Sequence, residues 1–160
     1  MHRLGDGEIS VDSLDPSVAD AYVRGTTVTV TKRSAGTATI VVRVAEGTNY
    51  LSPGSDTCDI TCIERLYLPS QAKTLTYNGG TQRPTWSSDY NTATMTLSGT
   101  TSGVNAGSYP ARFTPKTYYK WYDGTTSAKT AYWRIGKAPG SLSLSKYTAT
   151  IDYNATTTTF

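Results

Sequence analysis

The residues best suited to binding chemistry form a short aromatic run late in the chain. Four of the five positions from 118 to 122 carry rings, namely Tyr118, Tyr119, Trp121 and Tyr122. Strand alternation buries only half of such a run, so some of these rings should reach solvent. Exposed rings can stack on sugars or anchor a protein partner. We take the four residues as a candidate ligand-binding patch. The simpler alternative, which stays open, is that Trp121 and one tyrosine pack onto the fold while the others are amphipathic surface.

Metal-binding and nucleophilic chemistry have few residues to use. Cys58 and Cys62 are the two cysteines. Four residues along a strand separate them by roughly 13 Å, beyond the ~7 Å limit for a disulfide, so we expect two core thiols. The single histidine, His2, excludes most catalytic triads, and a metal site needs more ligands than these. We therefore expect no metal and no cofactor.

The first twenty residues contain a cluster of carboxylates, made up of Asp6, Glu8, Asp12, Asp15 and Asp20. Such a cluster suggests a calcium loop or a pair of catalytic carboxylates. The Asp-x-Asp-x-Asp-Gly spacing of a calcium loop is absent, and solvated strands and turns explain the residues better. With no other catalytic constellation in the sequence, we predict that the chain is not an enzyme.

Alternation of apolar and polar residues predicts the elements that carry these side chains. Segments 27–31 (with the valines inward), 38–44 and 58–62 alternate with a period of two, and turn residues separate them. The same pattern of alternating segments separated by turn residues begins again near Leu66. It predicts strands at 74–77, 94–97, 109–113 and 131–135 and a hairpin around Asp123-Gly124. Twelve tyrosines, fourteen glycines and seven prolines suit short strands separated by turns. The sequence predicts an all-β sandwich fold.

The two halves of the chain superpose without a gap over their later parts. Gly36 falls on Gly107, and the same offset keeps the core parity in four further pairs, Ile40 with Ala111, Val42 with Phe113, Tyr50 with Trp121, and Cys62 with Trp133. This indicates two diverged copies of one module. We place a first module at residues 1–64 and a second at 65–138.

One element of the second module resembles immunoglobulin-like folds. Segment 105–109 reads Asn-Ala-Gly-Ser-Tyr and is similar to the Asp-x-Gly-x-Tyr element of that fold. The resemblance implies that Tyr109 forms a tyrosine corner, largely buried and with its hydroxyl bonded to the backbone. It also offers Trp86 for the buried aromatic position of strand C. Ala111 stands where antibody domains have a cysteine, so no disulfide between sheets is implied.

The first module resembles the group 2 type of bacterial immunoglobulin-like domains. Segments 15–19 (Asp-Pro-Ser-Val-Ala), 27–31 and 35–40 (Ala-Gly-Thr-Ala-Thr-Ile) follow the order of that family. Modules of this kind occur in phage tail and virion proteins and in bacterial surface adhesins. The resemblance implies an extracellular, cell-surface or virion location.

The same resemblance concerns both ends of the sequence. It implies that the first module, residues 1–64, lacks its two opening strands, and residues 139–160 look like the opening strands of a further module. Their apolar anchors are Leu142, Leu144, Ile151 and Phe160. Such a tail should complete the first module of a second molecule by strand addition, so we predict head-to-tail self-association through residues 141–160.

Charge and hydropathy limit the classes of partner that we expect. The net charge is +3 and no basic run is present, so we expect no nucleic acid, and no apolar run reaches the length of a membrane span. The function expected is a non-catalytic structural and adhesive module that acts as a spacer and binds a cell-surface glycan or protein weakly. The alternative is an ancillary carbohydrate-binding module of a secreted glycan-active enzyme.

Overall fold

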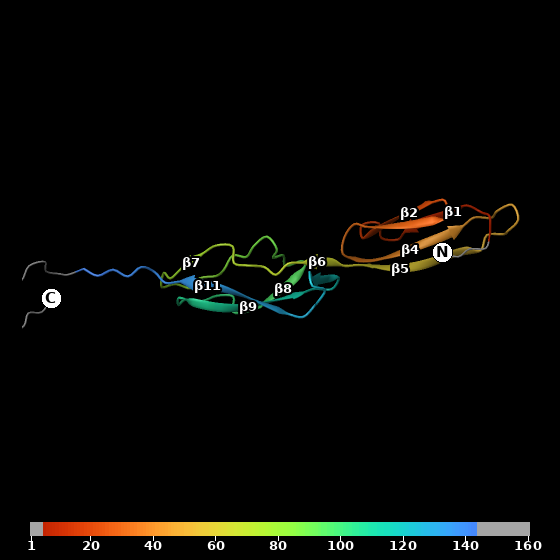
Figure 1. Cartoon of the computed structure of the whole chain (residues 1–160). Helices are drawn as coiled ribbons and strands as arrows, with labels where there is room; N and C mark the ends of the chain where they lie inside the picture. The colour runs from red at the N-terminus through yellow and green to blue at the C-terminus, as the bar shows by residue number, and fades with distance from the viewer. Residues whose placement is uncertain (1–4, 144–160) are drawn as a thin grey trace, which may run out of the picture.

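The computed structural model describes residues 5–143, and every regular element in that range is a strand (Figure 1). The all-β class is therefore confirmed. The strands are β1 Ile9–Ser13, β2 Ala19–Arg24, β3 Thr27–Lys32, β4 Gly36–Val44, β5 Gly54–Cys62, β6 Glu64–Leu66, β7 Leu75–Thr76, β8 Met95–Gly99, β9 Gly107–Pro115, β10 Tyr119–Trp121 and β11 Lys129–Gly136.

Strands β1 to β5 form two small layers. One layer is an antiparallel sheet in the order β1-β4-β5, and the other is the β2–β3 hairpin (Figure 1). The hairpin turns at Gly25-Thr26, where Gly25 has a φ of 61°, a conformation that glycine adopts without strain. Val18 and Ala19 pack against Ala38 and Cys62, so the even-numbered side chains of β4 and β5 face the hairpin.

Strands β6 to β11 form a second set of sheets that shares no strand with the first. Its main sheet has the order β7-β11-β9-β8, in which β7 runs parallel to β11 and the other pairs are antiparallel. A two-stranded parallel sheet joins β10 to β6. Strand β6 begins two residues after β5 ends, and in Figure 1 the two sets of strands follow one another along an elongated molecule.

A common three-stranded unit occurs in both sets. Strands β4 and β9 have equal length, start at the superposed glycines Gly36 and Gly107, and each lie between two antiparallel neighbours. Ile9 pairs with Val44, and Met95 pairs with Pro115, which is the residue that falls on Val44 in the same superposition. Strand β8 therefore takes the place beside β9 that β1 takes beside β4.

The gapless superposition is wrong at the last strand by two residues. Gly36 pairs with Cys62, whereas Gly107 pairs with Ile135 and not with Trp133. A slip of two residues keeps every side chain on its face, because side chains alternate with that same period. The alternation of inward and outward side chains therefore matches between the two halves, although the aligned residues of the last strand do not occupy equivalent positions in their sheets.

Three further expectations for the second half need correction. The predicted strand 74–77 is only the two residues of β7. Residues 123–124 form a turn, but β10 and β11 on either side of it do not pair with each other, because β10 pairs with β6. Trp86, offered for the aromatic position of strand C, lies in no strand and forms only an isolated bridge with Gln71, although its ring packs edge-on against Phe113 at 4.8 Å.

The two sets of strands enclose cores of unequal size. The larger core is built from Leu66, Met95, Ala111, Phe113, Trp121, Trp133 and Ile135. In the first set, Val18, Ala19, Ala38 and Cys62 form a smaller cluster, and Ile9, Ile40 and Val41 are buried outside it. Val30 of β3 was expected to point inward but is 37% exposed, because little of the structure covers that side of the hairpin. Apolar burial is the main favourable term in folding, so the first set should be the less stable one.

We predict two unfolding transitions that tryptophan fluorescence separates. Trp86, Trp121 and Trp133 are the only tryptophans and all lie in the second set, so fluorescence reports that set alone. Circular dichroism reports both sets and should begin to change at a lower temperature. Met95→Ala should destabilise only the second set, whose transition fluorescence follows, by about 2–5 kcal/mol of unfolding free energy. Coincident melting curves by the two probes would contradict this.

Candidate functional site

Trp121, expected in an exposed aromatic patch, is instead part of the core. Its side chain is 1% exposed and packs among the large apolar residues of the second set. The indole N–H donates to the carbonyl of Ser127 at 2.8 Å, so its one polar atom is satisfied. Trp121 cannot present a face to a ligand, and the alternative in which it packs onto the fold is the correct one for this residue.

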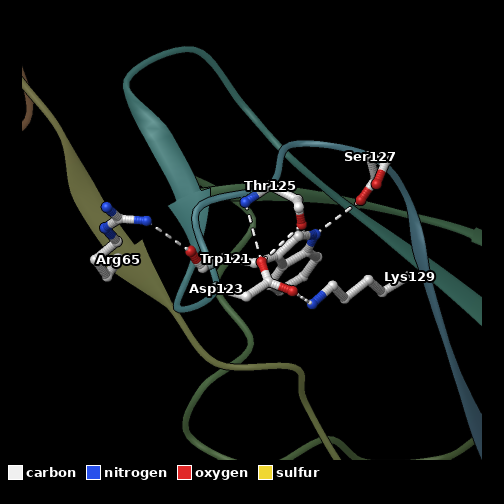
Figure 2. A network of polar contacts seen from close by, with 6 residues as sticks. All are labelled: Arg65, Trp121, Asp123, Thr125, Ser127 and Lys129. Carbon is white, nitrogen blue, oxygen red and sulfur yellow. Dashed lines mark hydrogen bonds and ion pairs between the residues drawn. The ribbon is translucent and has the colours of Figure 1, made fainter.

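The loop from Trp121 to Lys129 wraps around the Trp121 side chain (Figure 2). The Trp121 backbone N–H donates to the Thr125 carbonyl, and the Trp121 carbonyl accepts from the Gly124 N–H, both at 2.8 Å. The Arg65 guanidinium also donates to that Trp121 carbonyl, at 3.2 Å. Gly124 has a φ of 90°, which favours glycine at this turn. The loop is thus closed by its own backbone and tied to β6.

The Asp123 carboxylate organises the outer side of the same loop. It accepts hydrogen bonds from the Thr125 N–H at 3.0 Å, from the Thr125 hydroxyl at 2.7 Å, and from the Lys129 ammonium at 2.5 Å (Figure 2). The Lys129 nitrogen also lies 5.6 Å from the centroid of the Trp121 ring. The Lys129 hydrogen bond, followed by those from Thr125, holds the pKa of Asp123 well below its ordinary value. The charged carboxylate is therefore the form that the loop stabilises.

Two tyrosines form the exposed aromatic surface of this end of the second set. Tyr122 is 68% exposed and Tyr67 is 59% exposed. Their rings stack at 5.1 Å between centroids with an angle of 18° between planes. The parallel pairing of Leu66 with Trp121 places the next residue of each segment side by side. Sequence reasoning missed Tyr67, since no signal in the sequence shows that β6 and β10 pair.

The other two predicted patch residues are half-buried. Tyr119 packs against the core. Tyr118 has a φ of 69°, uncommon for a residue with a side chain, and its carbonyl accepts the Glu64 N–H at 2.9 Å. The structure thus brings Tyr122 together with Tyr67 as the exposed pair, and it places Tyr118 and Tyr119 at the start of the second set.

Tyr109 makes a local hydrogen bond at the start of β9. Its hydroxyl donates to the Asn105 carbonyl at 2.6 Å, four residues earlier. Its ring stacks on Trp133 at 4.5 Å, and a Cβ added to Gly103 would stand 2.7 Å from the ring. The ring is partly buried and packs against the core of the second set, beside the exposed loop that holds Asn105. The interpretation of this contact as an immunoglobulin tyrosine corner stays a prediction.

The cysteines differ from each other. Cys62 is buried, as expected, whereas Cys58 is exposed and the expectation of a second core thiol was wrong. Both point from β5 to the same side, but only Cys62 belongs to the buried cluster with Val18 and Ala19. His2 lies outside the described residues. Among residues 5–143, no group of three or more histidine, cysteine or acidic side chains is placed to hold a metal.

The N-terminal carboxylates are dispersed over separate partners. Asp6 accepts hydrogen bonds from Asn49, and Asp15 accepts one from Ser17. Asp12 pairs with Arg43 and Asp20 with Arg33 on the exposed surface, where the Arg33 hydrogen bond lowers the pKa of Asp20. These contacts are those of surface strands and turns. Within the described range, no helix has the length and apolar character needed to cross a membrane.

Comparisons with models of protein families, with curated proteins and with solved structures gave no match to this chain. The likeness to bacterial immunoglobulin-like domains therefore rests on the sequence segments quoted above.

We predict that Tyr109→Phe lowers the unfolding free energy of the second set by about 1 kcal/mol, the usual net value of one hydrogen bond. Tryptophan fluorescence during denaturation measures the change. Tyr132→Phe is the matched control, since Tyr132 is an exposed tyrosine of the neighbouring strand β11. Equal effects of the two substitutions would show that the Asn105 contact does not stabilise the fold.

We also predict a pH-dependent effect of Asp123→Asn. The pKa of Asp123 is depressed in the folded chain, so its contribution is complete above the ordinary value of 3.8 and is lost as the pH falls below it. The destabilisation caused by the substitution should therefore be present at pH 7 and should shrink toward pH 2. Lys129→Met should show the same trend, because it removes the same ion pair. An effect of equal size at pH 7 and pH 2 would contradict the assignment.

Proposed function

We propose that the chain is a non-catalytic structural and adhesive element, built from tandem immunoglobulin-like modules, of a phage virion or a bacterial surface protein. Its role is to act as a spacer and to bind a surface weakly, in an extracellular setting. The observation that carries this proposal is the repeated three-stranded unit, whose equal central strands β4 and β9 start at Gly36 and Gly107. Repetition of one unit along an elongated chain is the organisation that a spacer requires.

The connection between the two sets of strands supports the spacer role. Strand β6 starts two residues after β5, which leaves Ile63 as the only residue between them. The Lys32 ammonium donates to the Ile63 carbonyl at 2.7 Å, and the Glu64 N–H donates to the Tyr118 carbonyl. A connection held from both sides transmits length and orientation better than a flexible linker does.

The weak binding role is assigned to the Tyr67–Tyr122 pair. Each ring uses one face for the stack, and both side chains are more than half exposed. An aromatic face that projects into water suits stacking on the apolar face of a sugar ring. This pair is also the observation that favours the alternative, an ancillary carbohydrate-binding module of a secreted glycan-active enzyme.

Glycan-array binding by the full chain and its variants tests the binding role. Tyr67→Ala and Tyr122→Ala should each abolish the signal, since both rings form the surface. Tyr132→Ala is the matched control, because it removes an equally exposed tyrosine from β11. Loss of glycan binding in the Tyr132→Ala control as well would contradict the assignment. So would retained binding in both Tyr67→Ala and Tyr122→Ala. Binding to a purified surface protein but to no glycan would favour adhesion over the carbohydrate-binding alternative.

A further inference from the structure

Strand β3 presents an open sheet edge in the first set of strands. In the described part of the chain its only strand partner is β2, and the two form a sheet of their own. Four of its six residues are exposed. An edge strand of this kind has backbone N–H and C=O groups along one side that another strand can pair with.

The space beside that edge is apolar and only half covered. Val30 pairs with Ala21, and Ala19 of the same face is buried, so Val30 points toward the β4–β5 layer. On the opposing layer, Ile60 is half-buried and Cys58 is exposed although both share the inward face with buried Cys62. A strand added to β3 would cover these three side chains at once.

A segment suited to that place lies at the opposite end of the molecule. The chain leaves β11 at Gly136, at the end farthest from β1 to β5 (Figure 1). Leu142 is 94% exposed, an apolar side chain left in water. The sequence then alternates, with leucine at 142 and 144 between serines at 141, 143 and 145, and continues Tyr-Thr-Ala-Thr-Ile over 147–151. Residues 144–160 lie outside the described residues, and their sequence is long enough for one or two strands of the length of β1 to β3.

We propose that residues 141–160 of one molecule add to the β3 edge of a second molecule, with Leu142 and Leu144 covering Val30, Ile60 and Cys58. The pattern fits because an added strand needs apolar residues on one face and polar residues on the other. Donor and acceptor surfaces lie at opposite ends, so the contact is heterologous and generates open chains of molecules. This inference stands on the open edge and does not depend on the immunoglobulin assignment.

Complementary variants of the full chain test the proposal by sedimentation velocity over a range of concentrations. The wild-type chain should assemble as concentration rises. The double variant Leu142→Asp with Leu144→Asp should stay monomeric, and Ser143→Asp with Ser145→Asp, which adds the same charge to the other face, should still assemble. On the acceptor, Val30→Asp should abolish assembly, and Thr31→Asp, one residue along and on the opposite face, should not.

Mixing the two defective variants provides the sharpest measurement. The Leu142→Asp/Leu144→Asp chain keeps an intact acceptor, and the Val30→Asp chain keeps an intact donor. Their mixture should therefore form dimers and nothing larger, although each variant alone is monomeric. A symmetric contact would give no such rescue, so the absence of dimers in the mixture overturns the proposal.

Thiol reactivity supplies an independent readout that also reports folding. Cys58 should react with dithiobis(nitrobenzoate) in the monomer and become protected as wild-type chains assemble. Buried Cys62 should stay unreactive in every folded variant. Reaction of Cys62 in the Val30→Asp chain would show that this chain has unfolded, and Val30→Thr then takes its place as the acceptor variant. A wild-type chain that is monomeric at all concentrations overturns the proposal. So does a monomer in which the leucine double variant exposes Cys58, since that result means the tail folds back within one molecule.

Discussion

The burial of Trp121 is the interaction on which the organisation of the second half depends. Its side chain fills the core, and the loop that follows returns to bond its indole N–H through Ser127 and its backbone N–H through Thr125. Removing a buried tryptophan side chain typically costs about 3–5 kcal/mol. That energy fixes β10 in place, and β10 in turn holds β6, the first strand after the connection to β5. The join between the two sets of strands is thus secured by a residue far along the chain.

The same burial decides which aromatic rings face solvent. With Trp121 inward, Tyr122 lies in the turn that the Gly124 N–H closes on the Trp121 carbonyl, and its side chain is exposed. The parallel pairing of β6 with β10 then brings Tyr67 beside it. The sequence offers four candidate rings within five positions, but the exposed surface consists of one ring from that run and one from a segment much earlier in the chain.

The alternation of apolar and polar residues predicts the central strands, but it does not predict how the short segments pair. Strand β9 follows from the pattern around Ala111 and Phe113, since buried and exposed positions alternate there as a half-buried sheet requires. Strands β6 and β10 have three residues each, too few to show a period, and their parallel pairing depends on contacts distant in sequence. The exposure of Cys58 was unpredictable for a related reason, because its face is apolar by pattern and its burial depends on what covers it.

The two halves of the chain cover the apolar faces of their sheets in different ways. Each has a central strand flanked by two antiparallel neighbours, and such a sheet must cover an apolar face. Between β1 and β4 the chain inserts the β2–β3 hairpin as a cover, whereas a short loop joins β8 to β9 and the cover comes from the segment before β8, through residues such as Leu66, Trp86 and Tyr90. At the start of the hairpin the small residues Val18 and Ala19 pack against Ala38 and Cys62, while Ile60 and Cys58 of β5 stay less covered. The large aromatic cover buries the inner face of the second half, whereas the small one leaves Ile60 only partly buried and Cys58 exposed on the inner face of the first half.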